Sequence, residues 1–369
     1  MKIAFLAPRF HTNQISITKY LLKNKNKVSF YVTRMSQIED HSMVKPSVID
    51  LNFFFKIIKF LINSKNPLFD YRYGLPSISQ LLSFRSSKFD LLIIRDPVNL
   101  MGLSVFLFCK LIGLKIILYV QRDIYKNNSF SIKEIIEKIL IKLFKTKCIS
   151  PCLGNLSKKI KYVNKITYLP FCLPVTNYKK KWFHNNKINI LTVGKFIFRK
   201  KHLLLIRALN KVKVKNNFKL TIIGECSNRE NLSYLNKVRK QVKMSNLEID
   251  ILKNVKPKIL NNIYKKQDLF VLPSVNEPAS ISNLEAMSHS LPVITTDTNK
   301  TSCYTQDGVN GYIVKSNDIN DLINKLELLI NSKVKLKKFG KKSFNIVKNN
   351  HKPEVVYGNF FKSVLKFKK

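Results

Sequence analysis

The feature that most constrains the fold of this chain is the repeated alternation of short β-branched runs with longer segments of helical period. Strand, helix and strand in that order form the unit from which parallel sheets are built. We expect strands in the first half at residues 2–6, 28–32, 91–94, 116–120 and 167–169, with helices at 104–112 and 131–144. In the second half we expect strands at residues 189–193, 219–223, 249–252, 269–272, 292–295 and 312–314. The pattern predicts an α/β chain with two Rossmann-like sheets.

Chain length and one polar stretch set the expected domain boundaries. A chain of 369 residues suits two domains of ~150 to 180 residues each. The basic stretch at residues 176–187, with Pro174 just before it, has the composition of a linker. We expect one Rossmann-like domain in residues 1–175 and another in residues 188–350. Residues 351–369 are predicted to form a C-terminal helix, and packing of this helix back on the first domain is a hypothesis.

The charge balance points to anionic partners. The chain has 66 Lys and Arg against 22 Asp and Glu, a formal net charge of +44. Three explanations compete: the anionic face of a membrane, a nucleic acid, or the lysine excess of an AT-rich genome. Base composition alone is an incomplete explanation, because AT-rich codons also encode Glu and acidic residues stay rare.

The apolar runs are too short for a secretory signal or a membrane span. The N-terminal MKIAFLAPRF reaches its proline after only a few apolar residues, which fits a first strand better than a signal sequence. The best candidate for a span, residues 98–120, is interrupted by Asn99, Lys110 and Lys115. We expect a cytoplasmic protein, with peripheral binding to the inner face of the membrane as a further hypothesis.

One segment has two interpretations that the sequence leaves open. LNFFFKIIKFLIN, residues 51–63, interleaves Phe and Ile with Lys56 and Lys59, which share one helical face. The segment could lie in a membrane interface, with its lysines toward anionic headgroups. Alternatively, it packs on the sheet as an ordinary helix with both lysines facing solvent.

The cysteines show no metal-ligand spacing. We expect all six to be reduced core residues, with a redox pair of Cys148 and Cys152 as the alternative. The six are Cys109, Cys148, Cys152, Cys172, Cys226 and Cys303. No metal site is therefore predicted.

The most informative stretch is LPSVNEPASISNLEAMSHSLPVIT, residues 272–295, because it follows a strand and opens a helix. We expect this helix to run from Ala279 to about Ser288, with Pro278 tolerated in its first turn. Its N-terminus would face the carboxyl ends of the parallel strands, where open α/β sheets bind ligands. The backbone amides of Ala279, Ser280 and Ile281 are candidate ligands for a diphosphate.

Two carboxylates frame the start of this helix. Glu277 lies just before it and Glu285 within it, a separation of ~12 Å along a helix. That distance suits a sugar at one end and a ribose at the other. A carboxylate can accept hydrogen bonds from ribose hydroxyls, and one near a sugar can balance positive charge developing at the anomeric carbon.

A basic loop follows another strand in ILTVGKFIFRKKHLLLIRAL, residues 190–209. The strand ends at Gly194, and Lys195 together with Lys200 or Lys201 would reach the same edge of the sheet. Their positive charge would neutralise a diphosphate as the bond between the sugar and oxygen breaks.

Taken together, these motifs resemble the donor-binding half of retaining glycosyltransferases of the GT-B fold, in the large group 1 (family four). The resemblance covers residues 190–314 through VGKFIFRKK, LTIIGE, EPASISNLE, LPVI and DGVNGYIV. It implies two Rossmann-like domains facing each other across a cleft. Residues 1–175 would then be the acceptor side and residues 188–350 the nucleotide-sugar donor side.

The resemblance also implies roles for the motif residues. Lys195 and Lys200 would bind the donor diphosphate, Glu285 the ribose, and Glu277, as the catalytic residue, the transferred sugar near the reacting carbon. In this family the leaving phosphate is thought to help deprotonate the acceptor hydroxyl on the same face, which retains the anomeric configuration. No metal or other cofactor is expected besides the nucleotide-sugar substrate.

The chain departs from the family pattern at several positions. Lys195 stands where the family often has Arg, and the first loop, APRFHTNQ at residues 7–14, lacks the usual glycine pair. Gln121 stands where the family often has a histidine, with Arg122 and Asp123 as nearby substitutes. These three residues and His11 are our candidates for acceptor-side contacts.

The favoured prediction is transfer of a sugar to a saccharide or lipid-linked acceptor in the synthesis of cell-surface glycans such as polysaccharide or lipopolysaccharide. Partners would be the nucleotide-sugar, the acceptor and an anionic membrane surface. A GT-B sugar-nucleotide epimerase, a basic nucleic-acid-binding protein and an inactive scaffold remain as alternatives. Nucleic acid is the less favoured partner, since the chain shows no recognised DNA- or RNA-binding motif.

Overall fold

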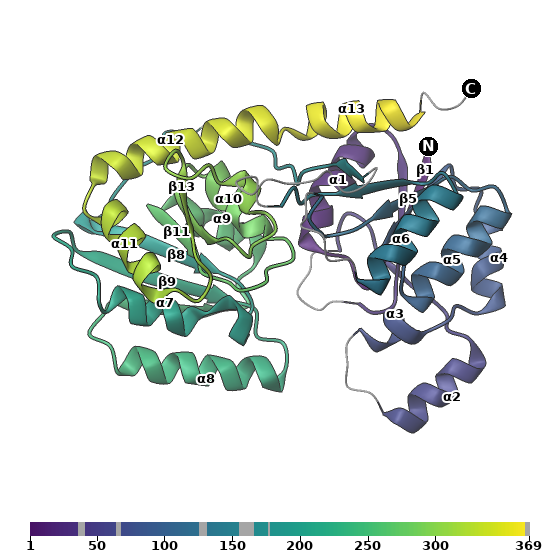
Figure 1. Cartoon of the computed structure of the whole chain (residues 1–369), viewed down its shortest axis with the longest axis horizontal. Helices are drawn as coiled ribbons and strands as arrows, with labels where there is room; N and C mark the ends of the chain where they lie inside the picture. Colours follow the sequence, from purple (N-terminus) through teal and green to yellow (C-terminus); the bar gives the residue numbers. More distant parts are fainter. Residues whose placement is uncertain (36–40, 64–67, 125–130, 155–165, 176–177, 366–369) are drawn as a thin grey trace. The chain divides into compact units, whose positions relative to one another are not determined.

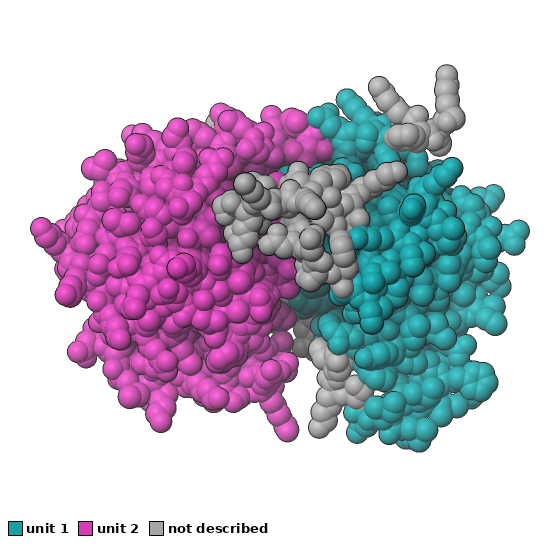
Figure 2. All heavy atoms as spheres, in the orientation of Figure 1, with its two compact units in different colours: residues 1–152, 159–170, 357–369 teal, residues 153–158, 171–356 magenta. Residues whose placement is uncertain are grey.

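The computed structural model describes residues 1–35, 41–63, 68–124, 131–154, 166–175 and 178–365. The chain forms two compact units (Figure 2). Unit 1 consists of residues 1–152, 159–170 and 357–369, and unit 2 consists of residues 153–158 and 171–356. Each unit contains its own parallel sheet with helices between successive strands (Figure 1). The predicted α/β class with two Rossmann-like sheets is confirmed.

Unit 1 is built on a seven-stranded sheet in the order β3-β2-β1-β4-β5-β6-β7. Its strands are β1 (Lys2–Ala7), β2 (Lys27–Val32), β3 (Ser47–Val48), β4 (Leu91–Arg95), β5 (Ile116–Tyr119), β6 (Lys147–Ser150) and β7 (Ile166–Tyr168). All neighbouring strands run parallel. β1 and β4 are buried along nearly their whole length, as expected for strands covered on both faces.

Two strands of unit 1 are absent from the sequence prediction. β3 contains only two residues, both exposed, so it has no apolar pattern to detect. β6 has the sequence KCIS, and its lysine, cysteine and serine hide the signal of a buried strand. The other five strands form within a few residues of their predicted positions.

The helices of unit 1 come from the first part of the chain and from its last described helix. They are α1 (Thr12–Lys23), α2 (Phe53–Ile62), α3 (Phe69–Tyr73), α4 (Ile78–Ser86), α5 (Leu100–Leu111), α6 (Ile132–Leu143) and most of α13 (Pro353–Leu365). Tyr20 of α1 contacts Tyr357 and Phe361 of α13, with ring centroids 5.8 and 6.3 Å apart. Residues 357–365 therefore pack on α1.

The structure contradicts the prediction that residues 51–63 pack on the sheet, whereas both lysines are about half exposed, as that alternative expects. α2 buries only Phe55 among its residues and leaves most of its apolar side chains exposed. Lys56 and Lys59 form ion pairs with Asp50 and Asp70, each at 2.7 Å. The lysines therefore bind carboxylates of the protein while staying partly in solvent, and the helix leaves its apolar side uncovered.

Unit 2 has the six predicted strands in the order β10-β9-β8-β11-β12-β13, all parallel. They are β8 (Ile188–Val193), β9 (Phe218–Gly224), β10 (Ile249–Lys253), β11 (Leu269–Leu272), β12 (Val293–Thr296) and β13 (Gly311–Val314). β11 and β12 are buried at every position. Their continuous apolar runs, without alternation, are typical of parallel strands covered on both faces.

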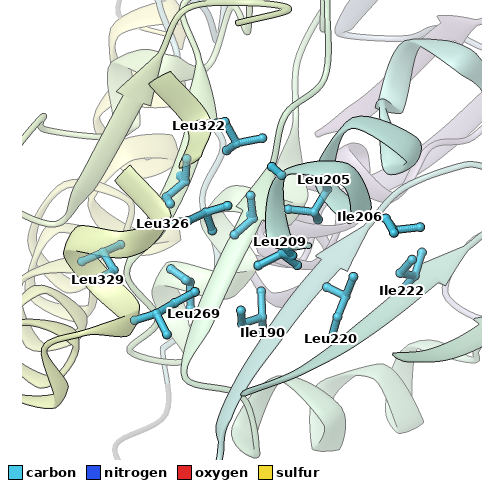
Figure 3. Close-up of a cluster of buried hydrophobic side chains, with 14 of the residues drawn as sticks. Ile190, Leu205, Ile206, Leu209, Leu220, Ile222, Leu269, Leu322, Leu326 and Leu329 are labelled. Carbon is cyan, nitrogen blue, oxygen red and sulfur yellow. The ribbon is translucent and has the colours of Figure 1, made fainter. Parts of the chain in front are cut away.

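Helices cover the sheet of unit 2 and complete its core. They are α7 (His202–Leu209), α8 (Arg229–Lys243), α9 (Pro257–Lys265), α10 (Ile281–Ser288), α11 (Ile319–Ile330) and α12 (Lys333–Asn350), with 3-10 turns η1 (His184–Asn186), η2 (Phe198–Lys200) and η3 (Ser302–Tyr304). α7 contacts both α8 and α11, whereas α10 packs against α12 (Figure 1). Figure 3 shows leucines of α7 and α11 meeting Ile190, Leu220 and Ile222 of the sheet.

The described part of the predicted linker is anchored on unit 2. The backbone N–H of Phe183 donates to Oδ1 of Asp268 at 2.9 Å. Gly340 of α12 leaves room for the ring of Trp182, since an added Cβ would lie 2.5 Å from Cη2 of that ring. Lys180 donates to the backbone oxygen of Gln267 at 2.7 Å. The stretch that its basic composition identified as a linker therefore packs on unit 2 in its described part.

No helix in the described ranges combines the length and apolarity that crossing a membrane requires.

Candidate active site

Residues of the sequence motifs follow three adjacent strands of unit 2. Gly194 comes directly after β8, Glu225 directly after β9, and Glu277 lies between β11 and α10. β9, β8 and β11 are neighbours in the sheet and run parallel. Their carboxyl ends therefore share one edge, which is where open α/β sheets place ligands.

Glu277 is held by two cations. Nζ of Lys200 lies 2.8 Å and Nη1 of Arg199 lies 2.7 Å from the same carboxylate oxygen, Oε2. Glu277 and Lys200 are both buried, whereas the Arg199 side chain is about one-third exposed. The backbone N–H of Val275 donates to the carbonyl of Arg199 at 2.9 Å and ties the two loops together.

The cations keep Glu277 ionised. Burial raises the pKa of a carboxyl group, but the ion pairs with Lys200 and Arg199 outweigh that effect and lower the pKa of Glu277 below its ordinary value. The site therefore contains a buried carboxylate with a net excess of positive charge beside it. Such a cluster can bind a hydroxyl-rich ligand and an anion together.

The geometry distinguishes Lys200 from Lys201. A Cβ on Gly194 would lie 2.8 Å from Cε of Lys200, so the missing side chain at Gly194 makes room for the lysine stem. Lys201 instead has φ 54° and precedes α7, with its Nζ 3.9 Å from the ring centroid of Phe198. Lys200 is therefore the lysine that reaches the carboxylate.

Lys195 lies with a different acidic residue. Its Nζ is 2.7 Å from Oε1 of Glu225, which also accepts a hydrogen bond from Oγ of Ser227 at 3.1 Å. Lys195 and Lys200 follow the same strand but bind different carboxylates. A diphosphate that uses Lys195 must share it with Glu225.

The helix after Glu277 begins later than the sequence predicts. α10 starts at Ile281, with Ser280 as an extended N-cap residue at φ −98° and ψ 116°. The backbone N–H of Ser280 donates to Oγ1 of Thr301 at 3.0 Å, so its proposed role as an amide ligand for a diphosphate conflicts with this bond. The amides of Ala279 and Ile281 keep that predicted role. Because Glu277 stands four residues before the helix, the helical estimate of its distance from Glu285 is also wrong.

Glu285 has an aromatic partner. The hydroxyl of Tyr264 in α9 donates to Oε2 of Glu285 at 3.1 Å, and the Tyr264 ring stacks on His289 with centroids 5.5 Å apart. Burial raises the pKa of Glu285, and the Tyr264 hydrogen bond opposes that rise. The hydroxyl of Tyr178 donates to the carbonyl of His289 at 2.9 Å.

Replacing Tyr264 with Phe is expected to move the pH dependence of nucleotide binding. Loss of the hydroxyl removes the bond that lowers the pKa of Glu285, so this pKa should rise further. If ribose binding needs the carboxylate, affinity is lost as the pH falls through that pKa, and the loss should begin at a higher pH in the variant. Titration of UDP over a pH series that starts near the ordinary glutamate pKa of about 4 and rises through neutrality measures the shift. Tyr178→Phe removes a hydroxyl from the same cluster and should leave the profile unchanged.

The candidate residues of unit 1 lie at the carboxyl edge of its own sheet. His11 follows β1 and caps α1, and its backbone N–H donates to Oε1 of Gln14 at 3.0 Å. Gln121 follows β5, where its Oε1 accepts from Arg95 at 2.9 Å. Arg122 forms an ion pair with Glu137, and Asp123 is the next residue in the same loop.

Burial raises the pKa of Glu137 to about 7, and Arg122 opposes that rise. The contact gives Arg122 a packing role within unit 1, beside the acceptor role predicted for it.

Three contributors to the site escaped the sequence prediction. Arg199 stands in a run of basic residues, where position alone does not single out one cation. Tyr264 and Thr301 come from segments outside the motifs, and only the fold brings them to Glu285 and Ser280. Of these three residues, only Arg199 could have been identified from the sequence, because a guanidinium suits carboxylate and phosphate binding better than an ammonium does.

The cysteines and the possible metal ligands can be judged over the part of the chain that the structure describes. No disulfide joins any of the six cysteines, and four of them are buried as predicted, whereas Cys226 and Cys303 are partly exposed. Within the described ranges, no group of three or more His, Cys, Asp and Glu side chains is arranged to hold a metal ion.

Two Rossmann-like units in one chain, with a charged cluster at the carboxyl edge of the second sheet, define a protein of the GT-B class. Structures of this class match nearly the whole chain. The Anabaena protein HepE, solved in complex with UDP and glucose, has a TM-score of 0.73 at 13% identity and covers 99% of this chain and 100% of its own.

Residues 175–345 match the family model described as glycosyl transferases group 1. The match lies in unit 2 and assigns residues 175–345 to this family, and the fold of the whole chain is that of GT-B structures. The suspected resemblance is confirmed.

Two curated relatives match shorter stretches. UDP-Gal:alpha-D-GlcNAc-diphosphoundecaprenol alpha-1,3-galactosyltransferase of Escherichia coli is 35% identical over 108 residues, which are 29% of this chain and 26% of the relative. Poly(ribitol-phosphate) alpha-N-acetylglucosaminyltransferase of Staphylococcus aureus is 28% identical over 165 residues, or 44% of this chain and 32% of the relative. The matches thus span about a quarter to a third of these relatives' own lengths.

Proposed function

We propose that this chain is a retaining glycosyltransferase that moves a sugar from a nucleotide-sugar to a saccharide or lipid-linked acceptor in cell-surface glycan synthesis. The observation that carries the proposal is the buried Glu277 carboxylate between Lys200 and Arg199, eight residues before Glu285. In this arrangement one carboxylate lies beside an excess of cationic groups, and a second lies on the helix that follows.

The proposed chemistry assigns a task to each group. Lys200, Arg199 and Lys195 stabilise the negative charge on the diphosphate as the bond between the anomeric carbon and its phosphate oxygen breaks. Both cations bond to Oε2 of Glu277, which keeps Oε1 for a hydroxyl of the transferred sugar. Glu285 binds the ribose hydroxyls. The acceptor oxygen bonds to the anomeric carbon on the face that the phosphate leaves, and its proton passes to a phosphate oxygen.

In this proposal, the side chains of Lys200, Arg199 and Lys195 supply the positive charge that a leaving diphosphate requires. We therefore propose transfer without an added metal ion or cofactor. Activity that persists in excess EDTA would support this part of the proposal, and activity restored only by a divalent cation would contradict it.

The names of related proteins guide the choice of substrates. HepE was solved with UDP, and the E. coli relative is named for UDP-Gal and a diphosphoundecaprenol acceptor. The S. aureus relative is named for poly(ribitol-phosphate). We propose a uridine nucleotide-sugar as the first donor to test. We further propose a glycan or lipid-linked acceptor, met at the anionic inner face of the cytoplasmic membrane.

A thermal-shift titration with UDP, GDP, ADP and CMP, without added metal, tests the donor site. One nucleotide should raise the melting temperature, because a ligand at 100 times its Kd stabilises the folded chain by about 2.7 kcal/mol. Glu285→Ala should remove this response. Glu230→Ala, at an exposed position of α8, is the control and should keep it.

Two outcomes would contradict the donor site. An unchanged response in Glu285→Ala would remove Glu285 from the nucleotide site. Stabilisation by RNA or DNA, with no response to any nucleotide, would favour the alternative of charge-driven nucleic-acid binding.

A further inference from the structure

α2 exposes an unusual amount of apolar surface for a helix of ten residues. Seven of its side chains are between 43% and 84% exposed: Phe53, Phe54, Ile57, Ile58, Phe60, Leu61 and Ile62. In Figure 1, α2 lies beyond α3, away from the sheet of unit 1. Exposed apolar patches of this kind mark sites that bind a membrane or another protein.

These side chains form one continuous arc around the helix. At 100° per residue, the seven residues span an arc of roughly 200° that contains no polar side chain. The remaining arc holds Phe55, Lys56 and Lys59. Phe55 is buried and stacks on Phe69 of α3, with ring centroids 5.6 Å apart. α2 is therefore fixed to unit 1 by one face and presents an apolar surface on the opposite side.

The two lysines lie outside the apolar arc, where they are about half exposed and pair with carboxylates. Lys56 pairs with Asp50 and Lys59 with Asp70, each at 2.7 Å. Their charges are thereby partly neutralised by carboxylates of unit 1. Neither lysine interrupts the arc, and the surface that α2 offers is apolar.

We propose that α2 inserts its apolar arc into the interfacial region of a lipid bilayer and docks unit 1 on the membrane. Lipid is the partner that fits this arc, because acyl chains accept apolar side chains in any direction, whereas protein interfaces surround an apolar centre with a polar rim. The net charge of +44 attracts the chain to anionic lipid at longer range. This docking adds to the proposed function the membrane surface at which the chain would bind its acceptor. Only the presence of an acceptor at that surface rests on the proposed function.

Vesicle flotation with the full-length chain tests the proposal. The probes are phosphatidylcholine vesicles and vesicles that also contain phosphatidylglycerol, each at low salt and at about 1 M salt, where the Debye length falls to ~3 Å. The native chain should bind both vesicles, and part of the binding should survive high salt. In Phe60→Ser/Leu61→Ser the partition coefficient should fall roughly tenfold or more, because each buried apolar side chain contributes strongly to insertion.

A matched variant controls for the loss of exposed apolar surface in general. Met244→Ser/Val334→Ser removes two side chains of unit 2 that are 73% and 77% exposed, and it should bind vesicles like the native chain. The UDP thermal shift measured on the same samples should be unchanged in both variants. If UDP does not shift the melting temperature of the native chain, the proposed function is overturned, whereas membrane docking is unaffected.

Three results would overturn membrane docking. The first is vesicle binding by Phe60→Ser/Leu61→Ser equal to that of the native chain. The second is native binding that disappears completely at high salt, since the contact would then be electrostatic. The third is a native dimer in light scattering that dissociates in this variant without any vesicle binding, which would identify a second copy of the chain as the occupant of α2.

Discussion

Replacing Glu277 with Gln should reduce the transfer rate by a factor of about 10² to 10³, the loss typical when one preorganised electrostatic contact is removed from an active site. The same change should lower the free energy of unfolding by about 3 kcal/mol, because it leaves a buried lysine without its counter-charge. Lys200 is buried and only 2.8 Å from the carboxylate, whereas Arg199 is one-third exposed and can reach water. Initial rates and denaturant unfolding measure the two effects.

The variant Glu277→Gln/Lys200→Met separates stability from catalysis. With both members of the buried pair removed, most of the lost stability should return, since no uncompensated charge stays buried. Activity should stay low, because the proposed sugar and diphosphate contacts are both missing. A stable and fully active Glu277→Gln would contradict the role of this carboxylate.

Replacing Gly311 with Ala should destabilise unit 2 by about 3 kcal/mol or more, the upper range for overpacking. Gly311 pairs with Val293 across β13 and β12, and an added Cβ would collide with the backbone oxygen of Val293. The backbone cannot move aside as a flexible side chain could, so the strands must separate. The melting temperature should fall by roughly 6 to 12 °C, at 2 to 4 °C per kcal/mol for a domain of this size.

Gly308→Ala is the matched control in the same turn. Gly308 has φ 72°, but nothing lies within 4 Å of an added Cβ. The change should cost only about 1 kcal/mol, the strain of a left-handed alanine. Gly311 does not have positive φ, so destabilisation no larger than that of Gly308→Ala would contradict the predicted collision with Val293.

The sequence predicts the sheet of unit 2 more completely than that of unit 1, for a physical reason. The strands of unit 2 are runs such as LFVL and VITT, buried at every position and separated by helical segments. In unit 1, β6 places Lys147, Cys148 and Ser150 in a strand of four residues. Its burial comes from neighbours that are distant in the sequence, so no local pattern reveals it.

The motifs locate the site but not its partners. The spacing of Glu277 and Glu285 is local information, and it identifies the loop and helix that carry both carboxylates. The hydrogen bond between Ser280 and Thr301 and the one between Glu285 and Tyr264 join residues 21 apart. Such contacts depend on how strands and helices pack, which is why the sequence placed the start of α10 two residues early.

Release of nucleoside diphosphate tests the central claim most directly. The native chain and Glu277→Gln are incubated with the sugar derivative of whichever nucleotide stabilises the protein, in EDTA, and the freed nucleotide is measured over time. The account predicts that the native chain cleaves the bond between the sugar and the phosphate and that Glu277→Gln does so at least about 100-fold more slowly. Equal rates in the two proteins, with the nucleotide bound to both, would contradict the assignment of Glu277 to the reacting sugar.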